Sequence, residues 1–331
     1  MALVSIIVPV YNNALSLSQL AERLNALTLA KPEHNFEFVY VDDGSRDDSV
    51  AVLERLAAKD ARVRVIKLSR NFGSNIAILA GMTYSSGDCV GFISADLQEP
   101  PETLLEMLSH WEAGHKVVLA VRQDRRGDPL VTRFFAGIFN WLFKKLVFPG
   151  LSPQGVGFFL IDRQVADVLL QCDEKNAHLI GLVLWSGFQY STVMYDRVSR
   201  PYGKSGWTFG KKLKYLIDAF TAFSYLPLRF SSALGLFLAA GGSIYALVII
   251  VLRVLNLVTV PGWTALTVIV LLTSGTQLIM LGVIGEYLWR SFEATRNRPP
   301  FIVESLLGTI SASSQEYEKA DSAPALPGSP V

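Results

Sequence analysis

Two long uncharged stretches place the strongest constraint on how this chain folds. Residues 231–252 and 263–285 contain no Asp, Glu, Lys or Arg. As helices, each is long enough to cross the hydrocarbon core of a bilayer, which is roughly 30 Å thick. A short connection at 253–262 separates them. The pattern therefore predicts a transmembrane hairpin, because helices buried in a soluble core rarely lack charges over such lengths.

Basic residues flank the hairpin on both of its outer sides, and its inner connection is short. They are Lys211, Lys212, Lys214 and Arg229 before it, and Arg290, Arg296 and Arg298 after it. The positive-inside rule then predicts that both long termini are cytoplasmic. We expect an integral protein of the cytoplasmic (inner) membrane, with a cytoplasmic domain at 1–229, the hairpin at 230–290 and a cytoplasmic, partly disordered tail at 291–331.

Composition excludes several other classes of protein. The net charge of the 331-residue chain is +1, so nothing indicates a nucleic-acid partner. Cys89 and Cys172 are far apart, and neither they nor the four histidines have the spacing of a metal site.

The first 125 residues alternate between strand and helix patterns. Apolar runs predict strands at 4–10, 36–43, 63–68, 89–94 and 117–121, and helical spacing predicts helices at 14–27, 47–59, 75–84 and 101–111. Strands connected by helices of this length indicate right-handed crossovers. The sequence therefore predicts an α/β fold with a mainly parallel central sheet.

Polar residues follow successive predicted strands, at positions where parallel strands would meet at one edge of the sheet. They are Pro9, Tyr11 and Asn12; Asp42, Asp43 and Ser45; Arg70 and Asn71; and Asp96 and Gln98. Ligands of open α/β sheets bind at this edge. Neither GxGxxG nor GxxxxGK[ST] is present, so a sugar nucleotide fits this edge better than a dinucleotide or a P-loop triphosphate.

Two further regions suggest a lipid-borne substrate. Arg122, Arg125 and Arg126 follow the fifth predicted strand. Amphipathic segments near 130–148 and 211–227 predict helices in the membrane interface, with ordinary packing as core helices as the alternative.

Four segments resemble the family-2 glycosyltransferases: SIIVPVYN at 5–12, VDDGSRD at 41–47, LSRNFG at 68–73 and SADLQEPP at 94–101. Together with the hairpin, they are similar to the polyprenyl-phosphate glycosyltransferases, the group of dolichyl-phosphate mannose synthase and the bacterial undecaprenyl-phosphate enzymes. The resemblance implies a GT-A-type domain that transfers one sugar, with inversion, from a nucleoside diphosphate sugar, with UDP-sugar favoured, to polyprenyl (undecaprenyl) phosphate. Family members form tetramers, so a homo-oligomer is plausible here.

The resemblance also implies roles for individual residues. Nucleotide-sugar contacts fall to Pro9, Tyr11, Asn12, Asp42, Asp43, Ser45, Arg70, Asn71, Asp96 and Gln98. Asp96 and Gln98 are expected to bind Mg²⁺ or Mn²⁺. The expected catalytic residues are Asp96, Arg122, Arg126 and Arg200. The residues expected to bind the acceptor phosphate are Arg122, Arg125, Arg126, Arg200, Lys204 and Ser205. The last three lie in a segment that resembles the family pattern Arg-x-x-Gly-x-Ser.

Two residues depart from the family pattern. Ser94 stands where the family has the first Asp of Asp-Ala-Asp, which weakens the expected metal site. Gly157 stands where relatives commonly carry an Asp, so no general base can be transferred to it. A phosphate acceptor has a second pKa near about 6 and is already anionic, so it needs alignment and charge neutralisation more than deprotonation.

Two alternatives remain open. A processive polysaccharide synthase of the same fold would carry a Gln-x-x-Arg-Trp motif, which this sequence lacks. A membrane scaffold that binds nucleotide without turnover would explain Ser94 and Gly157, but not the grouping of arginines near the predicted site.

Overall fold

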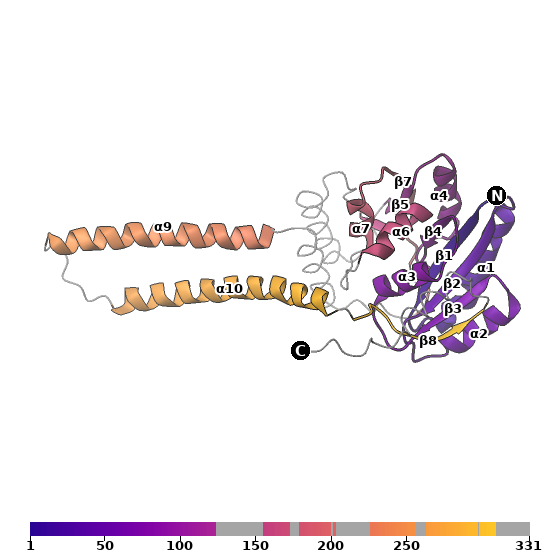
Figure 1. Ribbon diagram of the computed structural model, residues 1–331, viewed down its shortest axis with the longest axis horizontal. Coiled ribbons are helices and arrows are strands. Elements are labelled where there is room, and N and C mark those ends of the chain that lie inside the picture. The colour runs from indigo at the N-terminus through magenta and orange to yellow at the C-terminus, as the bar shows by residue number, and fades with distance from the viewer. Residues whose placement is uncertain are drawn as a thin grey trace, which may run out of the picture. The chain divides into compact units, whose positions relative to one another are not determined.

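The structure is a computed structural model that describes residues 1–123, 155–172, 179–199, 201–202, 226–255, 263–296 and 298–308. It divides into two units, of which the first comprises Met1–Phe209 with Pro299–Val331 and the second Gly210–Arg298. The first unit contains the sheet, and the second contains two long helices (Figure 1).

The described elements of the first unit follow the predicted alternation. They are β1 (Leu3–Val10), α1 (Ala14–Ala30), β2 (Asn35–Asp42), α2 (Ser49–Lys59), β3 (Val63–Leu68), α3 (Ser74–Thr83), β4 (Cys89–Phe92), α4 (Thr103–Glu112), β5 (Val117–Arg122), β6 (Val156–Asp162), α6 (Arg163–Gln171), α7 (Leu179–Trp185), β7 (Tyr190–Tyr195) and β8 (Val303–Leu307). Every strand and helix predicted for the first 125 residues is present, with boundaries that differ by at most three residues. The α/β fold is therefore confirmed.

The strands of the described chain form one mixed sheet in the order β7-β5-β6-β4-β1-β2-β3-β8. β1 pairs in parallel with β2 and β4, β2 with β3, and β5 with β7. β6 runs antiparallel to both β4 and β5, and β8 runs antiparallel to β3. Six strands consequently point in one direction, and the sheet departs from the predicted parallel pattern only at β6 and β8.

Packing of α1 fixes the end of β1 against the loop after β4. Leu17, Leu20, Leu24 and Leu27 recur at helical spacing, and each is at most 2% exposed. Burial of such a side chain stabilises a fold by roughly 1.5–3 kcal/mol relative to exposure. At the start of the helix, the buried Ser16 hydroxyl donates a 2.6 Å hydrogen bond to the carbonyl of Ala95. The core thereby positions two of the loops that lie at the polar edge.

β8 was not predicted from the sequence. This short strand follows the second unit along the chain and pairs with β3, with Lys67 opposite Ser305 in the register (Figure 1). The Ser69 N–H donates a further 3.0 Å bond to the Ile302 carbonyl. The chain therefore returns from the second unit to the sheet that it left.

The second unit contains α9 (Leu226–Val254) and α10 (Trp263–Thr295), which lie side by side (Figure 1). Within α9, the 25 residues Leu228–Leu252 have a mean hydropathy of 2.3, and among the described residues this is the one helix long and apolar enough to cross a membrane. α10 is helical over the second predicted span, although a second crossing is not confirmed. The interfacial helices predicted near 130–148 and 211–227 lie outside the described residues, except for the last two positions, which begin α9.

Candidate active site

The polar residues predicted from the sequence gather at one edge of the sheet, where β1 to β5 have their carboxyl ends. Tyr11 and Asn12 follow β1, Asp42 ends β2 and precedes Asp43 and Ser45, Arg70 and Asn71 follow β3, Asp96 and Gln98 follow β4, and Arg122 ends β5. Pro9 is the next-to-last residue of β1 and pairs with Val41 of β2. In an open α/β sheet, this edge is the position of the ligand site.

Asn12 connects the loops after β1 and β2. Its N–H donates to the Ser45 hydroxyl at 3.0 Å, and its side-chain oxygen accepts from the Arg46 N–H at 2.9 Å. The backbone of Asn12 has φ 54°, a left-handed conformation that asparagine tolerates better than most residues. Asn12 and Ser45 thus hold the two loops together as well as lining the edge.

Asp43 uses both carboxylate oxygens to hold the loop after β3. Oδ1 accepts from the Phe72 N–H at 2.6 Å, and Oδ2 accepts from the Gly73 N–H at 2.9 Å. Burial raises the pKa of Asp43, while the two backbone hydrogen bonds oppose that rise. The geometry therefore gives Asp43 a structural task in addition to the ligand contact predicted from the sequence.

One carboxylate oxygen of Asp42 can accept a hydrogen bond from a ligand. It is fully buried, and its Oδ2 accepts from the Ser45 N–H at 3.1 Å. In the described part of the chain, its Oδ1 is buried and has no hydrogen-bond partner. An unsatisfied buried carboxylate oxygen favours a donor group from a ligand, such as a hydroxyl or a ring N–H.

A hollow of about 280 Å³ lies between these loops. Its lining comprises Tyr11, Gly44, Ser45, Arg46, Lys67, Leu68, Ser69, Arg70, Asn71 and Glu304. The Arg70 guanidinium lies 4.0 Å from the centre of the Phe72 ring, and the Lys67 ammonium pairs with Glu304 at 2.7 Å. Glu304 comes from β8, and no local sequence pattern predicts its presence here.

Gly44 is required where the loops after β2 and β3 approach each other. Its φ is +71°, and a Cβ would lie 2.7 Å from the Arg70 carbonyl carbon and 2.8 Å from the Asn71 nitrogen. Gly44→Ala is therefore expected to lower the melting temperature and to weaken nucleotide binding, measured by thermal denaturation and by titration with a nucleoside diphosphate. Gly114→Ala is the matched control, because Gly114 also has a positive φ (+99°) but nothing within 4 Å of its Cβ position. Equal effects of both substitutions would show that the loop contact is unimportant.

The loop after β4 contains a buried acid that was not among the predicted site residues. Glu99 is 6% exposed, and its Oε2 accepts from the Ser94 N–H at 2.9 Å. Burial raises the pKa of Glu99, and hydrogen bonding to Ser94 opposes the rise. Asp96 accepts the Gln98 N–H at 3.1 Å through Oδ1. The backbone of Ser94, at the position where the resemblance implies a carboxylate, therefore holds Glu99.

The chain after β7 closes over this loop. The Val198 N–H donates to the Gln98 carbonyl at 3.0 Å, and the Gln98 side-chain amide donates to the Val198 carbonyl at 3.4 Å. The Arg197 guanidinium donates to the Gln98 side-chain oxygen, the atom that was predicted to bind a metal. Burial lowers the pKa of Arg197, as does the charge of Arg122, while Glu99 and Asp96 oppose this effect. Arg197 was missed because it belongs to none of the recognised motifs.

The other residues of the predicted acceptor site lie outside the described residues: Arg125, Arg126, Arg200, Lys204 and Ser205. Their assignments stay predictions. Arg122 is described, pairs with Tyr195 of β7 and lies close enough to Arg197 for its charge to lower the pKa of that group.

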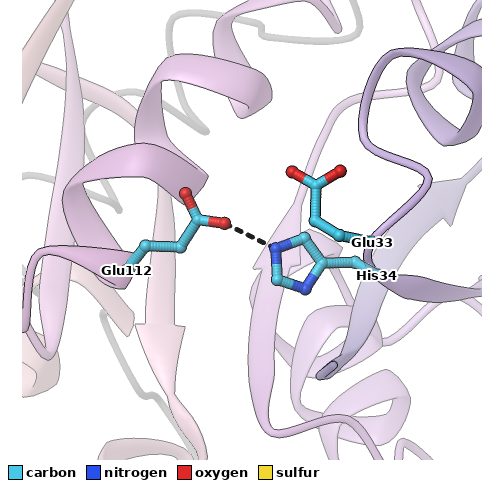
Figure 2. A group of neighbouring side chains, drawn as sticks. All are labelled: Glu33, His34 and Glu112. Carbon is cyan, nitrogen blue, oxygen red and sulfur yellow. Dashed lines mark hydrogen bonds and ion pairs between the residues drawn. The ribbon is translucent and has the colours of Figure 1, made fainter.

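A second acidic group lies away from this edge (Figure 2). Glu33 and His34 precede β2, and Glu112 ends α4, so the group lies at the opposite ends of these elements. His34 Nε2 is 2.6 Å from Glu112, and the Lys31 ammonium is 3.0 Å from Glu112 and 3.4 Å from Glu33. The three residues could in principle hold a metal ion. However, pairing with Glu112 raises the pKa of Lys31, so an ammonium already supplies the positive charge.

Comparisons with known proteins agree with this architecture. The model of Glycosyl transferase family 2 matches residues 5–169. The uncharacterized glycosyltransferase YkcC of Bacillus subtilis is 38% identical over 92% of this chain and 94% of its own length. The SfII prophage-derived bactoprenol glucosyl transferase of Shigella flexneri is 33% identical over 91% of this chain and 97% of its own. The undecaprenyl-phosphate 4-deoxy-4-formamido-L-arabinose transferase of Pseudomonas fluorescens is 33% identical over 92% and 90%.

Among solved structures, glucosyl-3-phosphoglycerate synthase of Mycobacterium tuberculosis aligns with a TM-score of 0.47 and 17% identity, over 67% of this chain and 80% of that one. The family match and the relatives of equal length decide the classification: the chain belongs to the family 2 glycosyltransferases and is a glycosyltransferase.

Proposed function

We propose that this enzyme transfers one sugar, with inversion, from a nucleoside diphosphate sugar to a polyprenyl phosphate. The observation that carries the proposal is a pair of neighbouring arginines at the polar edge of the sheet: Arg197 contacts the loop that contains Asp96, and Arg122 lies close to Arg197. The relatives named as bactoprenol and undecaprenyl-phosphate transferases match the chain over nearly its whole length, which supports the same class of acceptor.

The donor nucleotide is assigned to the hollow between the loops after β1, β2 and β3. Asp42 Oδ1 is available to accept from a ribose hydroxyl or a base N–H, and Tyr11 is 43% exposed at the rim. Arg70 and Arg46 supply positive charge for a diphosphate. We favour a UDP-sugar as the donor, in line with the resemblance of the sequence motifs.

Chemistry at the acceptor requires charge neutralisation more than a base. The second pKa of a phosphate monoester is about 6, so the group is largely dianionic at neutral pH. It can attack the anomeric carbon without losing a proton, and a glycine at position 157 is therefore tolerable. The arginines then align the two anionic groups for in-line displacement.

Asp96 is the residue that fits a divalent cation. Its carboxylate is a hard oxygen ligand at the edge, and the diphosphate of the donor would complete the coordination of Mg²⁺ or Mn²⁺. Gln98 fits less well than the sequence suggested, because its side-chain oxygen accepts from Arg197. When bound, the cation would neutralise the charge of the departing diphosphate. With a single carboxylate ligand, we expect weak affinity for the metal.

Topology supports a membrane hairpin with cytoplasmic ends. β3 precedes the second unit and β8 follows it, yet both belong to one sheet. If α9 crosses a membrane, the chain must cross again before β8, and α10 with 33 residues is long enough to do so. We therefore propose an anchor within 230–290, with both the catalytic domain and β8 on the cytoplasmic side and with homo-oligomers forming through the hairpins.

Nucleoside diphosphate release by the full-length protein in detergent tests this proposal. We expect release from one donor in a panel of UDP-, GDP- and dTDP-sugars, and only when undecaprenyl phosphate is present. Chelation with EDTA is expected to slow the reaction, and millimolar Mg²⁺ or Mn²⁺ to restore it. Absence of lipid-dependent release with every donor, alongside intact nucleotide binding, would favour a scaffold without turnover.

A further inference from the structure

The space beside Gly157 is filled by a tyrosine from another strand. A Cβ built on Gly157 would lie 1.9 Å from the Tyr195 hydroxyl oxygen. The Tyr195 ring packs edge-on against Phe158 with 5.2 Å between the ring centres, and the residue is 3% exposed. The tyrosine is therefore fixed in one place, with its hydroxyl where a side chain at position 157 would begin.

Two buried hydrogen-bonding groups on this strand end have no partner of normal geometry among the described residues. Within that part of the chain, neither the Tyr195 hydroxyl nor the Arg197 Nε makes a hydrogen bond of normal geometry, and the Arg122 guanidinium is the neighbouring group that interacts with the Tyr195 hydroxyl. Buried donors are nearly always satisfied in native proteins, because leaving one unpaired is costly. Two such groups separated by one residue point to a ligand that accepts hydrogen bonds.

Charge around these groups is arranged for an anion. Arg122 is paired with Tyr195 in the register of β5 and β7. The Arg122 guanidinium lies near both the Tyr195 phenol and Arg197, so two positive charges act on the hydroxyl and on each other. The carboxylates that face the same group are Glu99, which Ser94 holds, and Asp96. Two guanidinium groups repel each other at short range, and Glu99 and Asp96 offset part of that repulsion, so an anionic ligand between the guanidinium groups would be stabilised.

We propose that the Tyr195 hydroxyl and the Arg197 guanidinium form, together with Arg122, a subsite that binds a phosphate group of a substrate. This inference rests on the proposed function, because a polyprenyl phosphate and a nucleoside diphosphate supply the phosphates. Tyr195 donates one hydrogen bond, and the guanidinium groups donate charge-assisted ones. Burial raises the pKa of Tyr195, so the phenol stays protonated and able to donate at neutral pH.

Binding measurements with the full-length protein in detergent test the subsite without requiring turnover. Tyr195→Phe retains the ring and removes only the hydroxyl, and Arg197→Gln removes the charge. Each is expected to raise the dissociation constant about tenfold for undecaprenyl phosphate or for pyrophosphate, which carries the diphosphate without a base. A loss confined to the lipid assigns the acceptor phosphate, and a loss confined to pyrophosphate assigns the leaving group.

Tyr190→Phe is the matched control, because Tyr190 lies at the other end of β7. Gly157→Ala provides an independent test, since its methyl group would displace the Tyr195 hydroxyl and should weaken the same ligand. Unchanged affinity of Tyr195→Phe and Arg197→Gln for both probes, with melting temperatures like that of the wild type, would overturn the subsite. Loss of binding in these variants would support it even if no sugar transfer were found, which separates it from the proposed function.

Discussion

Asp96→Asn is expected to lower the rate of nucleoside diphosphate release at least about 100-fold, as is typical when a preorganised electrostatic group is removed from a transfer site. Asn can still accept the Gln98 N–H that Asp96 Oδ1 accepts at 3.1 Å, so the turn of the loop is retained. The substitution thus removes charge while keeping shape. The loss should appear in kcat, because the carboxylate acts on the charge that develops as the diphosphate departs.

Steady-state kinetics and thermal denaturation of the same preparation check this prediction. The melting temperature should change by no more than about 2 °C, since no buried hydrogen bond is lost. Asp167→Asn is the control, because Asp167 is an exposed aspartate on α6 that pairs only loosely with Arg163 at 3.8 Å. Activity of Asp96→Asn within threefold of the wild type would remove Asp96 from the catalytic group and from the metal site.

Local sequence patterns predicted the half of the sheet that is built from consecutive βα units. β1 to β5 are apolar runs that end at turn residues, and their parallel pairing follows from the helices between them. β6 and β7 were not predicted, because their pairing with β5 joins segments far apart in the chain. β8 is five residues long, half exposed and polar at its centre, so neither its length nor its pattern distinguishes it from a loop.

The sequence predicted the site residues that directly follow predicted strands. It did not predict those that reach the polar edge through tertiary contacts. Asp42, Arg70 and Asp96 all reach the polar edge because parallel strands end there. Tyr195 and Arg197 reach the Asp96 loop through β7, whose position in the sheet no local pattern reveals. Glu304 reaches the nucleotide hollow through β8 in the same way.

The two departures from the family pattern acquire a common physical explanation. The uncharged side chain of Ser94 forms a hydrogen bond with the buried Glu99, where a second carboxylate would add repulsion. Gly157 leaves room for the Tyr195 hydroxyl. Neither position carries the negative charge that the resemblance implies there. The edge is consequently more favourable to anionic phosphates than the family pattern would make it.

Asp43→Asn is expected to be the most destabilising substitution at this edge. Asp43 accepts two backbone N–H groups with its two oxygens, and asparagine offers one acceptor oxygen and an NH₂ group that faces the other donor. Loss of one charge-assisted bond, together with an unsatisfied donor, costs roughly 3 kcal/mol of the free energy of unfolding. For a domain of this size, the melting temperature should fall by roughly 6–10 °C. Nucleotide affinity should fall with it, because the loop that carries Arg70 is released.

The pH dependence of this effect has a defined sign. Burial raises the pKa of Asp43 in the folded state above its unfolded value, so the folded state binds the proton more tightly. The contribution of Asp43 to stability therefore grows as the pH falls through the raised pKa toward the unfolded value of about 3.9. The difference in free energy of unfolding between the wild type and Asp43→Asn should consequently be larger at about pH 4 than at neutral pH.

Asp42→Asn is the matched comparison, because Asp42 is the neighbouring buried aspartate with a single backbone hydrogen bond, from Ser45, and an unpartnered Oδ1 among the described residues. Asparagine can keep the Ser45 bond, so Asp42→Asn should destabilise the fold less than Asp43→Asn. It replaces the acceptor proposed for the nucleotide with a donor, so it should weaken nucleotide binding directly. Thermal denaturation and nucleotide titration of both variants separate these roles. Equal melting temperatures would mean that Asp43 does not hold the loop after β3. Unchanged nucleotide affinity in Asp42→Asn would mean that Asp42 Oδ1 accepts no hydrogen bond from the nucleotide.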